Sequence, residues 1–161
     1  METTRPLRVY IETTVWNFPF ADDAPERRDI TRRFFEEVRA GRYEVYISTT
    51  VAEEIGRAPE PRRSQLQSLV DEIAPAVLEP SEEALALARE YIASGAVPES
   101  HRNDATHIAV AVLENMDLLV SWNFQHIVRV STRRVVSATS RMAGYREIEI
   151  CTPEEVIDDN T

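Results

Sequence analysis

The sequence contains no lysine, only one cysteine and only four glycines among its 161 residues. The single cysteine, Cys151, excludes an internal disulfide framework and any zinc site built from cysteines. No apolar run approaches the roughly 20 residues that a helix needs to span a bilayer. The segment Met1 to Pro6 carries an acid where a signal peptide needs basic residues, and no apolar region follows it. We therefore expect a cytoplasmic protein without a membrane partner.

The scarcity of glycine also bears on function. No glycine-rich phosphate loop is present, which argues against a phosphatase or a nucleotide-binding protein built on such a loop. The sequence contains no internal repeat and no low-complexity segment. With 43% hydrophobic and 29% charged residues, its composition is typical of a globular protein. This length and composition predict a single domain over residues 1–161.

The charge balance is acidic, with a net charge of −10 from 28 acids and 18 bases, and all of the bases are arginine. An excess of acids argues against broad, non-specific binding to nucleic acid, which depends on releasing counterions from phosphates. The arginines nevertheless cluster around residues 27–33, 57–63 and 129–134. These clusters are either a solvated surface of mixed charge or sites of phosphate recognition, for which the guanidinium group is well suited.

Short apolar runs alternate with amphipathic stretches along the chain. Strands are expected at residues 7–11, 45–47, 77–78, 118–120 and 148–150, and helices at 29–40, 51–55, 62–73, 81–92, 103–115 and from 153. This alternation predicts an α/β fold, a three-layer α/β/α sandwich with a mainly parallel central sheet. In such sheets ligands bind beyond the carboxyl ends of the strands, near the point where the strand order reverses.

Acidic residues stand at the expected carboxyl ends of the first two strands. Glu12 directly follows the first strand, where it is either a site residue or a carboxylate bonded to the amides that open the next helix. After the second strand come Glu53 and Glu54, which lie on different faces of a helix. Glu54 is expected to face the strand ends and Glu53 to face solvent.

Two further segments bring polar residues toward the same edge. Asp104 and His107 lie three residues apart at the start of the helix 103–115, where Asp104 also complements the helix dipole. Ser121 and Asn123 follow the strand 118–120 and are alternatively caps of the next helix. His101, His107 and His126 do not share the spacing of a zinc motif, and His107 is expected to be a packing residue.

Taken together, the polar residues at the expected strand ends indicate a function more clearly than each does alone. Oxygen ligands without cysteine or paired histidine favour Mg²⁺ or Mn²⁺ over zinc. Acidic clusters built from distant positions are how phosphodiester-cleaving enzymes hold such ions. The sequence therefore predicts a metal-dependent hydrolase with an acidic site at the strand ends.

Four segments carry a resemblance to the PIN-domain family of metal-dependent ribonucleases, particularly the VapC-like toxins of toxin–antitoxin pairs. The segments are, in order, residues 9–16, 48–55, 104–109 and 119–127, and the similarity extends from Val9 through Ile157. The third segment is the most specific match. Each segment alone is weak, and their order and spacing carry the resemblance.

The resemblance implies an endoribonuclease that uses Mg²⁺ or Mn²⁺ and cleaves an RNA substrate. The metal ligands it implies are Glu12, Glu54 and Asp104, and Asn123 completes the catalytic set. Thr13, Ser121 and His107 are expected around these residues, and Arg57 and Arg102 are candidate contacts to the RNA backbone.

Two departures from the family pattern open an alternative. The first acid is usually Asp, whereas this chain has Glu12, and the fourth position is often Asp, whereas this chain has Asn123. Three carboxylates suffice for one divalent ion but hold a second less firmly. The alternative is a catalytically weak or inactive PIN-like module that binds RNA or protein.

The resemblance also implies partners. A cognate antitoxin is expected if the protein is a toxin, and a homodimer is a further expectation. Apolar side chains at Trp16, Phe18 and Phe20 would serve such an interface unless they pack into the core.

Overall fold

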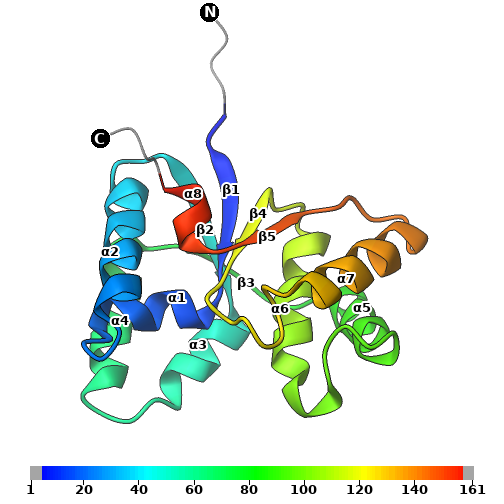
Figure 1. Cartoon of the computed structure of the whole chain (residues 1–161), viewed down its shortest axis with the longest axis horizontal. Coiled ribbons are helices and arrows are strands. Elements are labelled where there is room, and N and C mark those ends of the chain that lie inside the picture. Colours follow the sequence, from blue (N-terminus) through cyan, green and yellow to red (C-terminus); the bar gives the residue numbers. More distant parts are fainter. Residues whose placement is uncertain (1–4, 158–161) are drawn as a thin grey trace, which may run out of the picture.

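The computed structural model describes residues 5–157; residues 1–4, part of the N-terminal segment considered above, and residues 158–161 lie outside the described part. A central sheet of five strands organises the fold (Figure 1). The strands are β1 Leu7–Ile11, β2 Tyr43–Ser48, β3 Ala76–Leu78, β4 Leu118–Val120 and β5 Glu149–Cys151. Every pairing between neighbouring strands is parallel, which confirms the expected sheet.

The strand order is β3-β2-β1-β4-β5, so β1 lies at the centre and the chain reverses its direction of growth there. The first three strands build one half of the sheet outward from β1. The chain then returns to the other side of β1, where Ile11 pairs with Val120 of β4. The carboxyl ends of β1 and β4 therefore lie side by side at the position where ligands bind in open α/β sheets.

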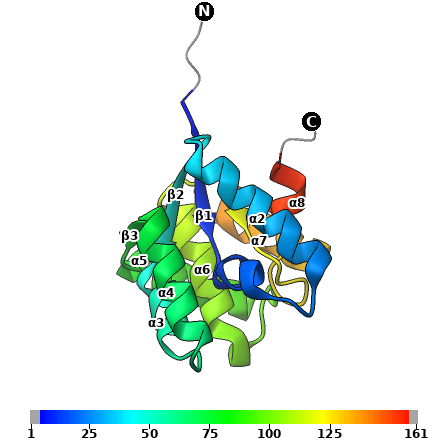
Figure 2. The same ribbon diagram turned by 90° about the vertical axis from the view of Figure 1, so that its left-hand side faces the viewer.

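Helices cover both faces of the sheet and complete the expected three-layer α/β/α fold. The helices are α1 Thr13–Asn17, α2 Pro25–Arg39, α3 Thr49–Gly56, α4 Arg62–Ile73, α5 Glu82–Ala93, α6 Arg102–Leu113, α7 Val130–Met142 and α8 Pro153–Val156, with the 3₁₀ turns η1 Phe18–Phe20 and η2 Glu99–His101. In Figure 1, α1, α2 and α4 lie on one side of the sheet and α5, α6 and α7 on the other. Figure 2 looks onto the side covered by α2 and α4.

Hydrophobic side chains of the core pack on both faces of the sheet. On the first side, Trp16 packs against Phe35 with ring centroids 5.0 Å apart, and Phe34 meets Phe35 edge-on at 5.4 Å. On the second side, every residue of α6 from Asp104 to Val112 is buried, because α6 lies between the sheet and α5. Phe18 and Phe20 pack partly buried against the core.

Two helices have bounds that the sequence did not indicate, and each case has a physical reason. α1 is only five residues long, so its apolar pattern is too short to show a helical period. α7 buries Thr132, Val136 and Ser140, a stripe in which two of the three residues are polar. Their hydroxyls are satisfied internally, since Thr132 donates to the Ala96 carbonyl at 3.0 Å and Ser140 pairs with the Tyr91 hydroxyl at 2.6 Å.

The expected boundaries differ from the observed ones by a few residues. The helix expected from residue 29 begins at Pro25, because proline at the first helical position has a backbone already suited to a helix. The helix expected after β4 begins only at Val130, and Asn123 instead opens a turn.

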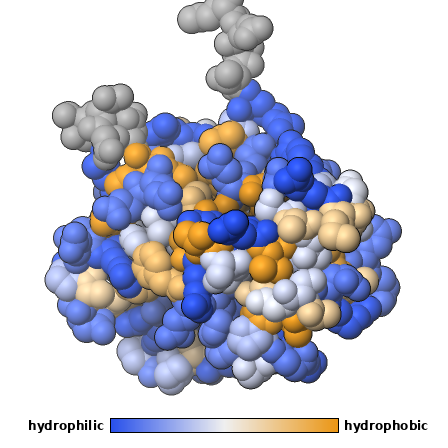
Figure 3. Space-filling view, turned by 45° about the vertical axis from the view of Figure 1, so that its right-hand side comes forward, coloured by the Kyte–Doolittle hydropathy of each residue, from blue (hydrophilic) through white to orange (hydrophobic). Residues whose placement is uncertain are grey.

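The described surface is mainly hydrophilic on the face shown in Figure 3, where hydrophobic residues form small, separate patches. The exposed large hydrophobic residues are scattered over different elements: Leu7, Val77, Phe124, Val130 and Met142. None of the helices within residues 5–157 is long and apolar enough to cross a bilayer. The homodimer stays an expectation.

Cys151 provides a test of the packing at the edge of the sheet. The residue ends β5 and is buried, and burial raises the pKa of its thiol to about 12, assisted by the charges of Glu155 and Glu149. At pH 8 we expect iodoacetamide to label the folded protein very slowly, because the thiolate is the reactive form. The unfolded protein should be labelled promptly, as measured by mass spectrometry with and without denaturant. Equal labelling rates would contradict this packing.

Candidate active site

A cleft of about 610 Å³ opens at the carboxyl ends of β1 and β4. Each of the four acidic or amide residues expected at the site lines it, although they come from four different parts of the chain. Glu12 follows β1, Glu54 belongs to α3, Asp104 lies in the first turn of α6, and Asn123 follows β4. The remaining lining residues are Thr13, Thr14, Asn17, Ile55, Ala58, Leu66, His101, Trp122, Phe124, Gln125 and His126.

Glu12 is the most buried of the acids, with 3% of its surface exposed. Its Oε1 accepts two short hydrogen bonds of 2.6 Å, from the hydroxyls of Thr14 and Ser121. Burial raises the pKa of Glu12 above its ordinary value, although the charge of His107 and the two hydroxyls act in the opposite direction. Hydroxyl groups hold the Glu12 side chain, in place of the backbone amides that the sequence suggested as its partners. These donors do not neutralise the charge of the carboxylate.

Glu54 is held by an imidazole as well as by a hydroxyl. Its Oε1 accepts a hydrogen bond of 2.7 Å from His107 Nε2 and one of 2.6 Å from the Thr13 hydroxyl. Burial acts to raise the pKa of Glu54, but the hydrogen bond and charge of His107, with Thr13 and Asn103, outweigh it and lower the pKa. Glu53 is exposed, so helix register distinguishes the two neighbouring glutamates.

His107 connects Glu54 to the sheet. Its ring is completely buried, and its Nδ1 lies 2.6 Å from the Tyr10 hydroxyl, which lies 2.7 Å from Ser48 Oγ. Burial acts to lower the pKa of His107, but the carboxylates of Glu54 and Glu12 outweigh it and raise the pKa. His107 is therefore a hydrogen-bonded core residue that fixes Glu54.

The side chain of Asn123 contacts Asp104 and also stabilises the turn that Asn123 opens. Its amide oxygen accepts backbone hydrogen bonds from Gln125 and His126, at 3.1 and 3.0 Å, and its Nδ2 donates to Asp104 Oδ2 at 3.3 Å. The Asn123 backbone N–H in turn donates to Ser121 Oγ at 2.9 Å. Because both lone pairs of the amide oxygen are used, Asn123 faces Asp104 as a donor.

The two arginines expected to contact RNA lie outside the cleft lining. Arg57 follows α3 as its C-cap, and the guanidinium of Arg102 pairs with Glu99. Both arginines were expected at the RNA backbone because they are close in sequence to the acids of the site. On a helix, closeness in sequence does not fix the face on which a side chain lies.

Several residues that line or border the cleft were not expected at the site from the sequence. His101 and His126 both approach Asp104, with Nδ1–Oδ2 distances of 3.8 and 3.4 Å. Arg27 lies over the rings of Trp122 and Phe124, at 5.4 and 4.7 Å from their centroids. No sequence spacing indicated these contacts, because each joins segments that meet only in the fold.

The donor set suits a hard divalent cation. Glu12, Glu54 and Asp104 offer oxygen ligands, and no arginine occurs among the described residues that line the cleft. Glu12 receives only neutral hydroxyl donors, and burial raises the pKa of Glu12 and of Asp104. Carboxylates that are desolvated and close to one another need positive charge, and Mg²⁺ and Mn²⁺ prefer such ligands.

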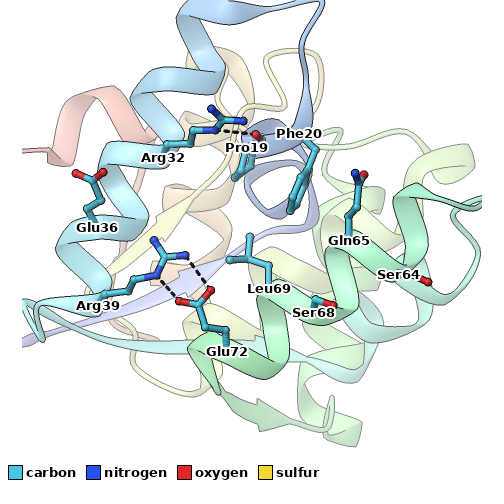
Figure 4. Close-up of a pocket in the computed structure, with 10 residues that line it drawn as sticks. All are labelled: Pro19, Phe20, Arg32, Glu36, Arg39, Ser64, Gln65, Ser68, Leu69 and Glu72. Carbon is cyan, nitrogen blue, oxygen red and sulfur yellow. Dashed lines mark hydrogen bonds and ion pairs between the residues drawn. The ribbon is translucent and has the colours of Figure 1, made fainter.

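A second groove of about 650 Å³ lies between α2 and α4 (Figure 4). Charged side chains that line it pair with one another: Arg39 makes a two-pronged contact with Glu72, including an Nη2–Oε1 distance of 3.0 Å. Arg32 donates to the Pro19 carbonyl at 2.9 Å. The groove contains no comparable cluster of acids, so the cleft at the strand ends is the candidate active site.

Comparison with solved structures identifies the fold. A chain of VapBC2 from Rickettsia felis, solved with a promoter DNA fragment, matches with a TM-score of 0.57 and 14% identity, over 91% of this chain and 98% of that one. The sarcin–ricin-loop-cleaving toxin VapC20 of Mycobacterium tuberculosis matches with a TM-score of 0.56 and 16% identity, over 87% and 98%. No protein-family model and no curated protein matches the sequence. The chain has the PIN-domain fold of VapC-like proteins.

The burial of Glu12 predicts that the acid destabilises the metal-free protein. We expect Glu12→Gln to raise the melting temperature in EDTA by roughly 2–4 °C, or about 1 kcal/mol, because a desolvated charge is removed. The same substitution should reduce the stabilisation that added Mn²⁺ gives, as measured by scanning calorimetry. Glu53→Gln, an exposed neighbour, should change neither quantity. A lower melting temperature for Glu12→Gln in EDTA would contradict the prediction.

Proposed function

We propose that the protein is a metal-dependent endoribonuclease and the toxin of a toxin–antitoxin pair, acting in the cytoplasm. The observation that carries the proposal is the convergence of Glu12, Glu54 and Asp104 on one cleft at the carboxyl ends of β1 and β4. The PIN-domain fold supports it, because VapC20, which shares this fold, is described as a toxin that cleaves the sarcin–ricin loop.

The three carboxylates would hold Mg²⁺ or Mn²⁺. When bound, such an ion supplies a water activated for attack on phosphorus and stabilises the negative charge that develops there. The rest of the site orients these ligands. Thr14 and Ser121 fix Glu12, His107 and Thr13 fix Glu54, and Asn123 fixes Asp104. Such supporting hydrogen bonds keep the ligands in place before the ion arrives.

Asn123 favours a site for one ion. A carboxylate in its place would lie beside Asp104, and the two charges would need a cation between them. The amide instead donates to Asp104 Oδ2 at 3.3 Å and removes that requirement. We therefore assign one strongly held ion.

Aromatic side chains at the cleft support an RNA substrate. Phe124 lines the cleft with 42% of its surface exposed, and Arg27 lies over its ring at 4.7 Å. Exposed aromatic rings stack on unpaired bases, and arginine attracts phosphates. Recognition must be local in this way because the net charge of −10 opposes long-range attraction of RNA. Arg57 and Arg102 stay predicted contacts to the RNA backbone outside the cleft.

An antitoxin partner is part of the proposal. The Rickettsia felis relative is a VapBC2 assembly bound to a fragment of its promoter. By extension, we assign this chain a cognate antitoxin.

A catalytically weak RNA- or protein-binding module is the second candidate. Asn123 in place of an acid weakens the hold on a cation, and the net charge of −10 opposes the turnover of a polyanion, so both features favour this candidate. Calorimetry with Mn²⁺ separates the candidates, because the nuclease requires binding of Mn²⁺ to the intact site.

Cleavage of RNA tests the proposed activity. We expect the purified protein to cleave a pool of structured RNAs only with Mg²⁺ or Mn²⁺, as resolved on denaturing gels. Asp104→Asn and Glu54→Gln should each lower the rate by roughly 100-fold or more, because each removes a charged ligand. Glu53→Gln on the same helix should cleave like the unmodified protein. Metal-independent cleavage, or equal rates for Glu53→Gln and Glu54→Gln, would overturn the assignment.

The role of Asn123 is tested separately by stability. Asn123→Asp should lower the melting temperature in EDTA by roughly 2–4 °C, or about 1 kcal/mol, because the new carboxylate faces Asp104. The same variant should gain more stability from Mn²⁺ than the unmodified protein does. Gln125→Glu adds the same charge at an exposed neighbouring position and should show neither effect. Identical behaviour of the two variants would rule out the contact with Asp104 as the cause.

A further inference from the structure

We propose that His101, Asp104 and His126 form a second metal site, which takes a divalent transition-metal ion of the zinc class rather than Mg²⁺. The three residues come from η2, the first turn of α6 and the turn after β4. One potential ligand atom from each lies within 4.8 Å of the others. This site shares Asp104 with the proposed oxygen-ligand site, but His101 and His126 belong to it alone, and its metal binding does not depend on the proposed nuclease activity.

The spacing of the three groups suits an ion better than direct hydrogen bonds. Asp104 Oδ2 lies 3.4 Å from His126 Nδ1 and 3.8 Å from His101 Nδ1. Both distances exceed those of good N–H···O hydrogen bonds, which are about 2.7–3.2 Å. In a tetrahedral zinc site with bonds of about 2.0–2.1 Å, ligand atoms lie roughly 3.3–3.5 Å apart. The distances to Oδ2 are therefore close to those between two ligands of one ion.

The chemistry of the ligands selects the class of ion. Imidazole nitrogen suits Zn²⁺ and its neighbours among the transition metals, whereas Mg²⁺ prefers oxygen ligands. Two histidines and one carboxylate are also the ligand types of catalytic zinc sites that leave a position open. All three residues line the cleft, so such an open position is available to a ligand from the cleft.

The site is supported by its surroundings. The backbone N–H of His126 donates to Asn123 Oδ1 at 3.0 Å, and Asn123 Nδ2 donates to Asp104 Oδ2 at 3.3 Å. The His101 and His126 rings lie close together and tilted, with centroids 4.0 Å apart and planes inclined by 32°. A hydrogen bond to the ligating carboxylate is typical of the residues that support a metal site. His107, the remaining histidine, is buried and bonded to Tyr10 and Glu54, so it is not part of this set.

Calorimetry with Zn²⁺ tests the site. The protein, stripped with EDTA and dialysed, is titrated with Zn²⁺ in an excess of Mg²⁺, which occupies the oxygen-ligand site. We expect one equivalent of Zn²⁺ to bind. The double variant His101→Ala, His126→Ala should bind Zn²⁺ about 100-fold more weakly or not at all. Glu54→Gln should bind Zn²⁺ like the unmodified protein while losing RNA cleavage, so the two proposals fail independently.

Two outcomes would overturn the second site. One is Zn²⁺ binding that survives in the double histidine variant, and the other is Zn²⁺ binding that is lost in Glu54→Gln. The melting temperature in EDTA shows whether each variant is folded. Independently of any variant, Zn²⁺ should shift the imidazole NMR signals of His101 and His126 and leave that of His107 in place. A shift confined to His107, or no shift at all, equally refutes the site.

Discussion

The buried imidazole of His107 joins the sheet to the cleft, and the geometry of the candidate site depends on it. One ring nitrogen meets Tyr10 on the central strand, and the other meets Glu54 on α3, while the residue itself belongs to α6. Because the ring has no access to water, each of its nitrogens needs a partner within the protein. The spacing between β1, α3 and α6 is thereby fixed, and with it the positions of Glu54 and Asp104.

The same site carries an electrostatic imbalance. Glu12 is buried among neutral donors, and the pKa values of Glu12 and Asp104 are both raised, with burial as the main cause. A fold that keeps acids in this state is destabilised locally, and binding of a cation to the folded form offsets that cost. Stability and the proposed metal binding are therefore linked through the same few side chains. Asn123 limits the imbalance, because its amide replaces a further negative charge beside Asp104.

The sequence indicated most of the fold and the acids of the site, for a physical reason. Buried parallel strands are nearly all apolar, so a polar residue at a strand end is conspicuous, and the topology then brings strand ends together. Helix periodicity distinguished Glu54 from Glu53. Helix periodicity did not indicate α7, because its buried stripe consists largely of hydroxyl-bearing residues. Periodicity could not indicate the pairing of His101 with His126, because 24 residues, including α6 and β4, lie between them along the chain.

The central position of β1 has a consequence for when the cleft comes into existence. Glu12 and Glu54 precede the reversal of the sheet, whereas Asp104 and Asn123 follow it, and the two pairs meet only after β4 docks beside β1. A nascent chain that has emerged from the ribosome only as far as β3 holds Glu12 and Glu54 but neither Asp104 nor Asn123, so its cleft is incomplete. The machinery that translates this protein is thus separated from its proposed RNA-cleaving activity until the chain has been made past β4.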